Sequence, residues 1–198
     1  MELYIMITAF VVILIIFLAI LFTKTGLKGY ETEKKRAGRV GERITNVILK
    51  EILNDDDVLI PNVRLNYKGK QTELDNLIVN DRGIFIIEVK NWSGDLVGGE
   101  DDYEWVKNKY TSAGNFYQGT VKNPIKQVNR QIFILANILR SYGINVNIEG
   151  YVFFLENNCP FINKQVLRNQ RDMDRVLHYG SDNKLTGAMR DRIVEVLS

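Results

Sequence analysis

The sequence predicts a mixed α/β domain, with a central mixed β-sheet flanked by helices, preceded by one transmembrane helix. Two observations support this fold class. An uncharged apolar run, 3–22, opens the chain, and the rest alternates between helical and strand periodicity. At 198 residues, the chain is long enough for one membrane element and one domain with a sizeable core.

Composition narrows the chemistry that the chain can perform. The formal net charge is only +2, so binding to nucleic acid must rest on a local basic patch. The single cysteine, Cys159, excludes an internal disulfide and a cysteine-rich zinc site. The single histidine, His178, excludes a histidine metal cluster and lies in a polar stretch without a nucleophile motif. Carboxylates, lysines and amides remain as the reactive groups.

The apolar run 3–22 predicts a single-pass membrane anchor. At about 1.5 Å per residue it reaches roughly 30 Å, the thickness of the hydrocarbon core. Glu2 precedes the run, which is unlike the basic start of a signal peptide. Basic residues follow the run and none precedes it, so we expect the remainder on the cytoplasmic side of the cell membrane. A basic juxtamembrane linker, 23–35, would lie against anionic headgroups.

The domain begins with a predicted helix over 33–53. Five apolar residues at helical spacing make one face of it: Val40, Ile44, Val47, Ile48 and Ile52. The sequence "NDDD" at 54–57 ends the helix. Tight turns at 68–70 and 80–83 then separate three strands, which makes successive strands antiparallel neighbours. These strands are predicted over 58–67, 71–79 and 84–91.

The second half of the chain adds short strands, a long helix and a buried strand. Residues 92–121 are rich in glycine, aromatic and charged residues, and predict short strands and loops, for instance around "YEWVKN". A helix over 123–143 is indicated by Asn123 as N-cap, Pro124 in the first turn and Gly143 as the stop. Its core stripe would be Val128, Ile132, Leu135 and Leu139. A strand over 148–156 and a closing helix near 184–197 follow.

The strand "IFIIEVK", 84–90, carries a carboxylate and an ammonium among apolar residues. Side chains alternate across a strand, so Glu88 and Lys90 lie on one face, about 7 Å apart. The turn at 80–83 brings Asp75 of the preceding strand beside Glu88. Burying these charges without partners is costly, which suggests that they are used. The alternatives are an exposed ion pair on an edge strand for Glu88 and Lys90, and a polar strand face for Asp75.

Two carboxylates beside a lysine suit divalent-metal chemistry. Asp75, Glu88, the backbone carbonyl of Val89 and waters offer the oxygen ligands that Mg²⁺ (or Mn²⁺) prefers. Such a metal acidifies a bound water and polarises a phosphoryl oxygen. Lys90 would orient that water or offset charge in the transition state.

Four ordered stretches of the sequence resemble the nuclease-related domain family, NERD, of the PD-(D/E)xK restriction-endonuclease-like superfamily. The resemblance covers about residues 36–156, implies a restriction-endonuclease-like core, and leaves 157–198 as a C-terminal extension packing on the domain. The four stretches are "GRVGERITNVIL" with Glu42, "TELDNLIV" with Asp75, "GIFIIEVKNWSG" with Glu88 and Lys90, and "NPIKQVNRQ" with Gln127.

The resemblance assigns a role to each of these polar residues. Asp75 and Glu88 match the metal-binding carboxylates, and Lys90 matches the catalytic lysine. Glu42 matches a glutamate that helps the metal site, or else it favours the N-terminus of its helix. Gln127 matches a glutamine that holds a water or a phosphate, or else it is an exposed helix residue. Asp75 follows Leu74, where the superfamily has proline.

The resemblance implies a membrane-anchored, divalent-metal-dependent nuclease that hydrolyses phosphodiester bonds of DNA or RNA. The alternative is a catalytically silent, nuclease-like module that binds nucleic acid or a protein partner at the membrane. Aromatic residues near the site would stack on bases or pack in the core: Trp92, Tyr103, Trp105, Tyr110, Phe116 and Tyr117. Basic residues there would contact phosphates or be solvated: Lys107, Lys109, Lys122, Lys126 and Arg130.

Overall fold

The computed structural model describes residues 13–17, 35–110, 114–180 and 184–197. The chain divides into two compact units, Met1–Arg39 and Val40–Ser198. The second unit contains both β-sheets and the candidate site residues Glu42, Asp75, Glu88, Lys90 and Gln127, and the fold described below is that of this unit.

The predicted membrane anchor falls largely outside the described residues. Of the run 3–22, only 13–17 is described, and it is helical. Within the described ranges, no helix combines the length and the apolar character that crossing a membrane requires. The anchor and the linker 23–35 therefore stay predictions from sequence.

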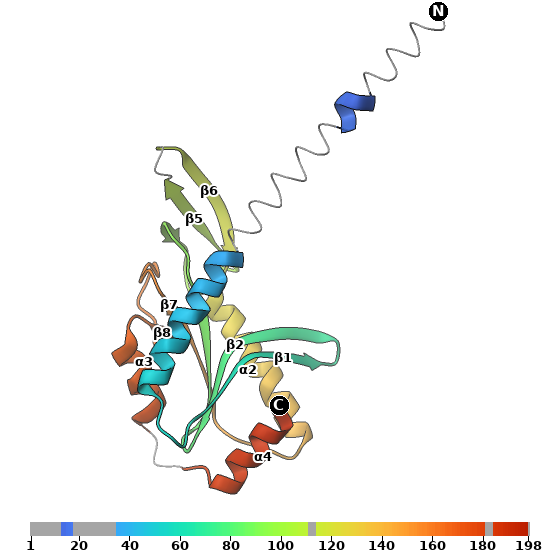
Figure 1. The fold of residues 1–198 in the computed structure, drawn as a ribbon, viewed down its shortest axis with the longest axis vertical. Helices are drawn as coiled ribbons and strands as arrows, with labels where there is room; N and C mark the ends of the chain where they lie inside the picture. The colour runs from blue at the N-terminus through green and yellow to red at the C-terminus, as the bar shows by residue number, and fades with distance from the viewer. Residues whose placement is uncertain (1–12, 18–34, 111–113, 181–183, 198) are drawn as a thin grey trace, which may run out of the picture. The chain divides into compact units, whose positions relative to one another are not determined.

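The core of the domain is a mixed five-stranded sheet with the strand order β1-β2-β3-β7-β8 (Figure 1). The pairs β1–β2 and β2–β3 are antiparallel, whereas β3–β7 and β7–β8 are parallel. The prediction of a central mixed sheet is therefore confirmed. Its strands are β1 Val58–Tyr67, β2 Lys70–Asn80, β3 Gly83–Lys90, β7 Ile148–Phe154 and β8 Val166–Leu167.

A second, antiparallel sheet of three strands follows β3 in the chain. It consists of β4 Asp95–Val97, β5 Glu104–Tyr110 and β6 Phe116–Lys122. Trp105 of β5 is fully buried and stacks on Phe154 of β7, with ring centroids 6.2 Å apart. Its indole N–H donates to the Gly99 carbonyl at 2.9 Å. The Trp105 ring therefore packs the three-stranded sheet against the end of the central sheet.

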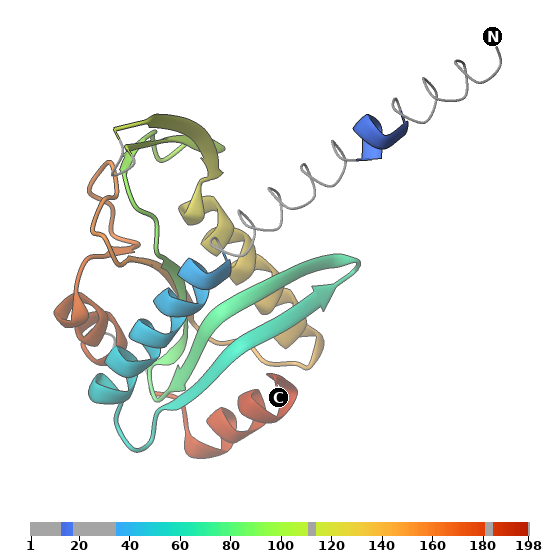
Figure 2. The same cartoon turned by 45° about the horizontal axis from the view of Figure 1, so that its top comes forward.

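Helices cover both faces of the central sheet (Figures 1 and 2). Along β3, Ile84 and Ile86 pack in one core with α2 Pro124–Ser141 and α4 Gly187–Leu197. The alternate residues, Phe85 and Ile87, pack in a second core with the helix 35–52 and α3 Gln170–His178. Because β3 is buried on both faces, any charge on it needs a partner.

The helix 35–52 approaches the sheet by a different face from the predicted one. Its buried residues are Gly41, Thr45 and Leu49, spaced four apart. A Cβ at Gly41 would lie only 2.9 Å from the Cβ of Asn91, so glycine allows the close approach. The predicted apolar face was wrong for three of its residues, which are 42%, 44% and 58% exposed: Val40, Ile44 and Val47. The other two, Ile48 and Ile52, do pack against the core.

The long helix begins where the sequence predicts. The Asn123 side chain accepts a hydrogen bond from the Ile125 N–H at 2.9 Å, and Pro124 occupies the first helical position. Gly143 has a positive φ of 71°, which glycine adopts without strain. The closing helix is also confirmed, as α4, whereas β8 and α3 have no counterpart in the prediction.

The only histidine joins two parts of the domain. The His178 ring lies 2.8 Å from a carboxylate oxygen of Asp57, in the turn after helix 35–52, and 2.7 Å from one of Asp174. Burial lowers the pKa of His178, but the hydrogen bonds to Asp174 and Asp57 outweigh it, so the pKa lies above 6.5. The charged imidazole is therefore favoured in the folded state.

We predict that His178 stabilises the fold more at pH 6 than at pH 9. A histidine with a raised pKa contributes its full stabilisation below its unfolded pKa, and loses it as pH rises through the folded pKa. The melting temperatures of the wild type and of His178→Gln should therefore differ most at pH 6 and converge toward pH 9. An equal difference at both pH values would show that the ring is uncharged in the folded protein.

Candidate functional site

The candidate site lies where the pairing of β2 with β3 ends. The register runs from Asn80↔Gly83 to Asn76↔Ile87 and stops before Asp75. Beyond that point the carboxylate of Asp75 accepts a hydrogen bond from the Val89 backbone N–H at 2.8 Å. A side chain thus takes the place of a backbone acceptor, which fixes Asp75 beside the segment that carries Glu88 and Lys90.

Glu88 is 2% exposed, and both of its carboxylate oxygens are hydrogen-bonded. Oε1 accepts from Lys90 Nζ at 2.5 Å and from Gln127 Nε2 at 2.6 Å. Oε2 accepts from Gln131 Nε2 at 2.7 Å. Since β3 lies between β2 and β7, the alternative of an exposed pair on an edge strand is wrong.

Lys90 is held at a defined position by several groups. Besides the ion pair with Glu88, its Nζ donates to Gln127 Oε1 at 3.1 Å and lies 5.4 Å from the centroid of the Trp92 ring. The Lys90 side chain is 13% exposed. Gln127 therefore touches both charged residues, and its reading as an exposed helix residue does not hold.

Gln131 is a site residue that the sequence analysis missed. It is fully buried, and its Nε2 also donates to the Glu73 carbonyl at 2.9 Å. Its Oε1 is buried without a hydrogen-bond partner among the described residues, so the amide can accept one more bond. The signal was its position one helical turn after Gln127, which places both amides on one face of α2.

The pKa of Asp75 reflects the other carboxylates that lie near it at this site. Burial, followed by the nearby charge of Glu88, raises the pKa of Asp75 to about 7. The hydrogen bond from Val89 and the charge of Lys90 act in the opposite direction, and Glu42 raises the pKa slightly further. A carboxyl group with such a pKa, set in a cleft, is typical of functional sites.

Asp75 lines an open cleft of about 1070 Å³. Gln127 and Glu42 line the same cleft, and Tyr103 and Lys122 bound it on the side of the second sheet. Glu88 and Lys90 do not line it and connect to it through Gln127. The cleft therefore brings together elements that are far apart in the sequence.

Glu42 lies beyond the first turn of its helix, because the residues from 35 onward are already helical. The reading of Glu42 as a first-turn glutamate that favours the helix N-terminus is therefore wrong. Its place on the cleft wall and its effect on the pKa of Asp75 put it near the carboxylate.

The donor groups at this site match part of what a metal ion needs. Within the described ranges, no three Asp, Glu, His or Cys side chains lie close enough together to hold one. Mg²⁺ needs fewer protein ligands, because it uses one or two carboxylates with waters and substrate phosphates. Asp75 fits that role. Glu88 fits only if it shares an oxygen that Lys90, Gln127 or Gln131 already binds.

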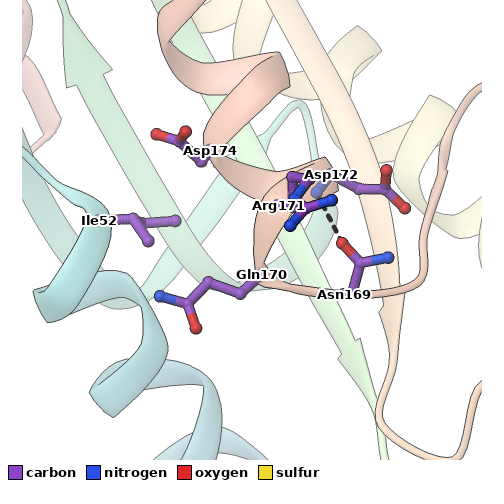
Figure 3. Close-up of a pocket in the computed structure, with 6 residues that line it drawn as sticks. All are labelled: Ile52, Asn169, Gln170, Arg171, Asp172 and Asp174. Carbon is purple, nitrogen blue, oxygen red and sulfur yellow. Dashed lines mark hydrogen bonds between the residues drawn. The ribbon is translucent and has the colours of Figure 1, made fainter.

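A second hollow, of about 750 Å³, lies at the start of α3 (Figure 3). Its lining includes Ile52, Gln170 and Asp174. Asn169 caps α3 by accepting from the Asp172 N–H at 2.9 Å, and the Asp172 carboxylate pairs with Arg175 at 3.0 Å. Asn169 and Asp172 stabilise α3 itself, so the cleft of Asp75 is the candidate site.

The fold and the candidate site together define the class of protein. It is a mixed α/β domain with a cluster of carboxylates and a lysine at the end of its central sheet. A comparison with protein families matches residues 37–155 to the nuclease-related domain, NERD. The chain belongs to this family, and the resemblance to NERD inferred from the four stretches is confirmed.

A search of curated proteins adds one relative, an uncharacterized protein of Bacillus anthracis. The two are 24% identical over 99 residues, which cover 50% of this chain and 44% of the relative. The chain thus matches less than half of that protein's length. No solved structure matches the chain.

We predict that Asp75→Asn stabilises the protein in the presence of a chelator. The raised pKa means that the ionised carboxylate costs stability increasingly from pH 3.8 up to about 7. Asparagine retains an acceptor for Val89 but carries no charge. At pH 8 the melting temperature should rise by a few degrees, since each kcal/mol shifts it by about 2–4 °C.

Asp81→Asn is the matched control, because the ion pair with Lys184 lowers the pKa of Asp81 and its charge therefore favours the fold. This variant should show no gain at pH 8. A lower melting temperature for Asp75→Asn than for the wild type at pH 8 would contradict the account.

Proposed function

We propose that this chain is a divalent-metal-dependent nuclease that hydrolyses phosphodiester bonds of DNA or RNA. Membership of the nuclease-related family supports a nuclease-like function. The observation that carries the proposal is the buried Lys90–Glu88–Gln127 cluster, which reaches the open cleft of Asp75 through Gln127. A fold without chemistry gains nothing from such charges inside its central strand.

In this proposal Asp75 and Glu88, with the backbone carbonyl of Val89, would hold Mg²⁺ or Mn²⁺. The bound metal would supply a water of lowered pKa and neutralise charge on the scissile phosphate. Glu42, on the cleft wall, would add to the negative field that attracts the cation.

The side chains of Lys90 and Gln127 would make the remaining interactions with the substrate. Lys90, which Glu88 and Gln127 hold in place, would donate to the phosphoryl oxygens as charge develops on them. Because these contacts exist before substrate arrives, the ammonium needs little reorganisation. Gln127 lines the cleft and reaches both charged groups, so it would fix the substrate phosphate relative to Lys90.

We further propose that the apolar run 3–22 anchors the domain at the cytoplasmic face of the cell membrane. The support is the length of the run and the basic residues that follow it. This part of the proposal is independent of the chemistry of the cleft.

Replacing Lys90 by alanine should reduce cleavage of labelled DNA or RNA by about 10²-fold or more, because a donor to the transition state is lost. The assay uses the full chain with Mg²⁺ or Mn²⁺, and chelation should abolish turnover. Lys50→Ala, at an exposed position of helix 35–52, is the control and should cleave like the wild type.

Lys90→Ala also leaves Glu88 without its cation, which typically costs about 3–5 kcal/mol and could unfold the domain. Asp75→Asn separates the two effects, because it should be at least as stable as the wild type and still fail to cleave. Equal turnover by the wild type and both variants would leave only the silent, nuclease-like binding module.

A further inference from the structure

We propose that the second sheet is a docking platform that leads single-stranded nucleic acid into the cleft of Asp75. The platform consists of Tyr103 and of the face of β5 and β6 that carries Glu104, Lys122, Tyr110 and Phe116. The inference rests on the proposed function and goes beyond it by naming the form of the substrate.

The structure separates the aromatic residues near the site into two groups. Trp105 is fully buried, and Trp92 packs edge-on against Phe154 with centroids 6.2 Å apart. By contrast, Tyr103 is 84% exposed, and Tyr110 and Phe116 are 68% and 50% exposed. The second group contributes little to the core and is available to a ligand.

The exposed rings and the cleft share one surface. In the register of β5 with β6, the pairs Glu104↔Lys122 and Tyr110↔Phe116 lie on the same face, since an even number of residues separates them. The first pair lines the cleft, together with the adjacent Tyr103. The second pair lies about 20 Å further along the strands. A strand of nucleic acid on this face would therefore end at Asp75.

Three basic side chains line the cleft beside the platform. Lys107 and Lys109 lie on the opposite face of β5 from Glu104 and Tyr110, since an odd number of residues separates them, and they do not belong to the platform. Lys126 Nζ lies 5.1 Å from the centroid of the Tyr103 ring, and Lys122, Lys126 and Arg130 all line the cleft. The cleft also carries the carboxylates of Glu42, Glu73, Asp75 and Glu104, so these three cations are the groups that would contact phosphates.

Exposed rings beside lysines favour a single strand over a duplex. A ring stacks on the face of a base, and a duplex hides those faces within its own stack. A duplex could therefore be bound only through contacts to its phosphates, without stacking on the rings. Polar Asn108 and Gln118, hydrogen-bonded to each other at 3.0 Å, separate the ring pair from the cleft. The platform is thus no continuous apolar patch of the kind that docks another protein.

The test measures binding without cleavage, using the full chain in mild detergent with a chelator. The probes are a fluorescein-labelled 12-nucleotide oligothymidine and a labelled 12-base-pair duplex. The wild type should bind the single strand more tightly than the duplex. Tyr103→Ala should weaken single-strand binding at least about fivefold and leave duplex binding unchanged. Phe116→Ala should act in the same direction.

Tyr179→Ala is the matched control, because Tyr179 is 68% exposed at the end of α3, away from the cleft. It should change neither affinity. Tighter binding of the duplex, or equal losses for both probes in Tyr103→Ala, would overturn the inference, as would the absence of any binding.

Cleavage assays distinguish failure of the platform inference from failure of the proposed nuclease function. Loss of cleavage in Lys90→Ala with unchanged binding in Tyr103→Ala would reject the platform and keep the nuclease. Tyr103-dependent binding with no metal-dependent cleavage would keep the platform and reject the nuclease.

Discussion

The rest of the site depends on one buried carboxylate. Glu88 lies in the central strand of a sheet that is covered on both faces, where an unpaired charge is costly. Lys90 and two amides of α2, Gln127 and Gln131, bind both of its oxygens. The same bonds that make the charge tolerable also fix Gln127, which lines the cleft, and Lys90, which is hydrogen-bonded to it. Stability and the proposed chemistry therefore rest on one set of contacts, and a change in any member should affect both.

The topology explains how these groups meet. β3 pairs in parallel with β7, so the chain between them must cross over, and α2 lies on that crossover. Its first turns reach the end of β3, where Glu88 and Lys90 lie. On the other side, β2 stops pairing before Asp75, and the Asp75 carboxylate caps the Val89 N–H. The second sheet is inserted between β3 and α2 in the chain, and this insertion brings Tyr103 and Lys122 to the cleft.

Much of this arrangement could be predicted from residues alone. Tight turns placed Asp75 opposite the Glu88 segment, and the Asn123-Pro124 start fixed the helix that carries Gln127. The helix 35–52 was harder, because its contact face depends on Gly41 and Thr45, which an apolar pattern does not reveal. Gln131 was missed, because its spacing from Gln127 indicates a shared helix face but only the packing of α2 on β3 shows that its amide reaches Glu88. The pKa of Asp75 likewise depends on burial, which no spacing rule supplies.

The central claim is that Asp75 and its neighbours bind a divalent cation. The most direct measurement is calorimetric titration of the full chain with Mn²⁺, compared with Asp75→Asn and with Asp81→Asn as the surface control. The account predicts saturable binding of Mn²⁺ to the wild type and to Asp81→Asn, and its loss in Asp75→Asn. Equal binding by all three proteins, or none by the wild type, would contradict it.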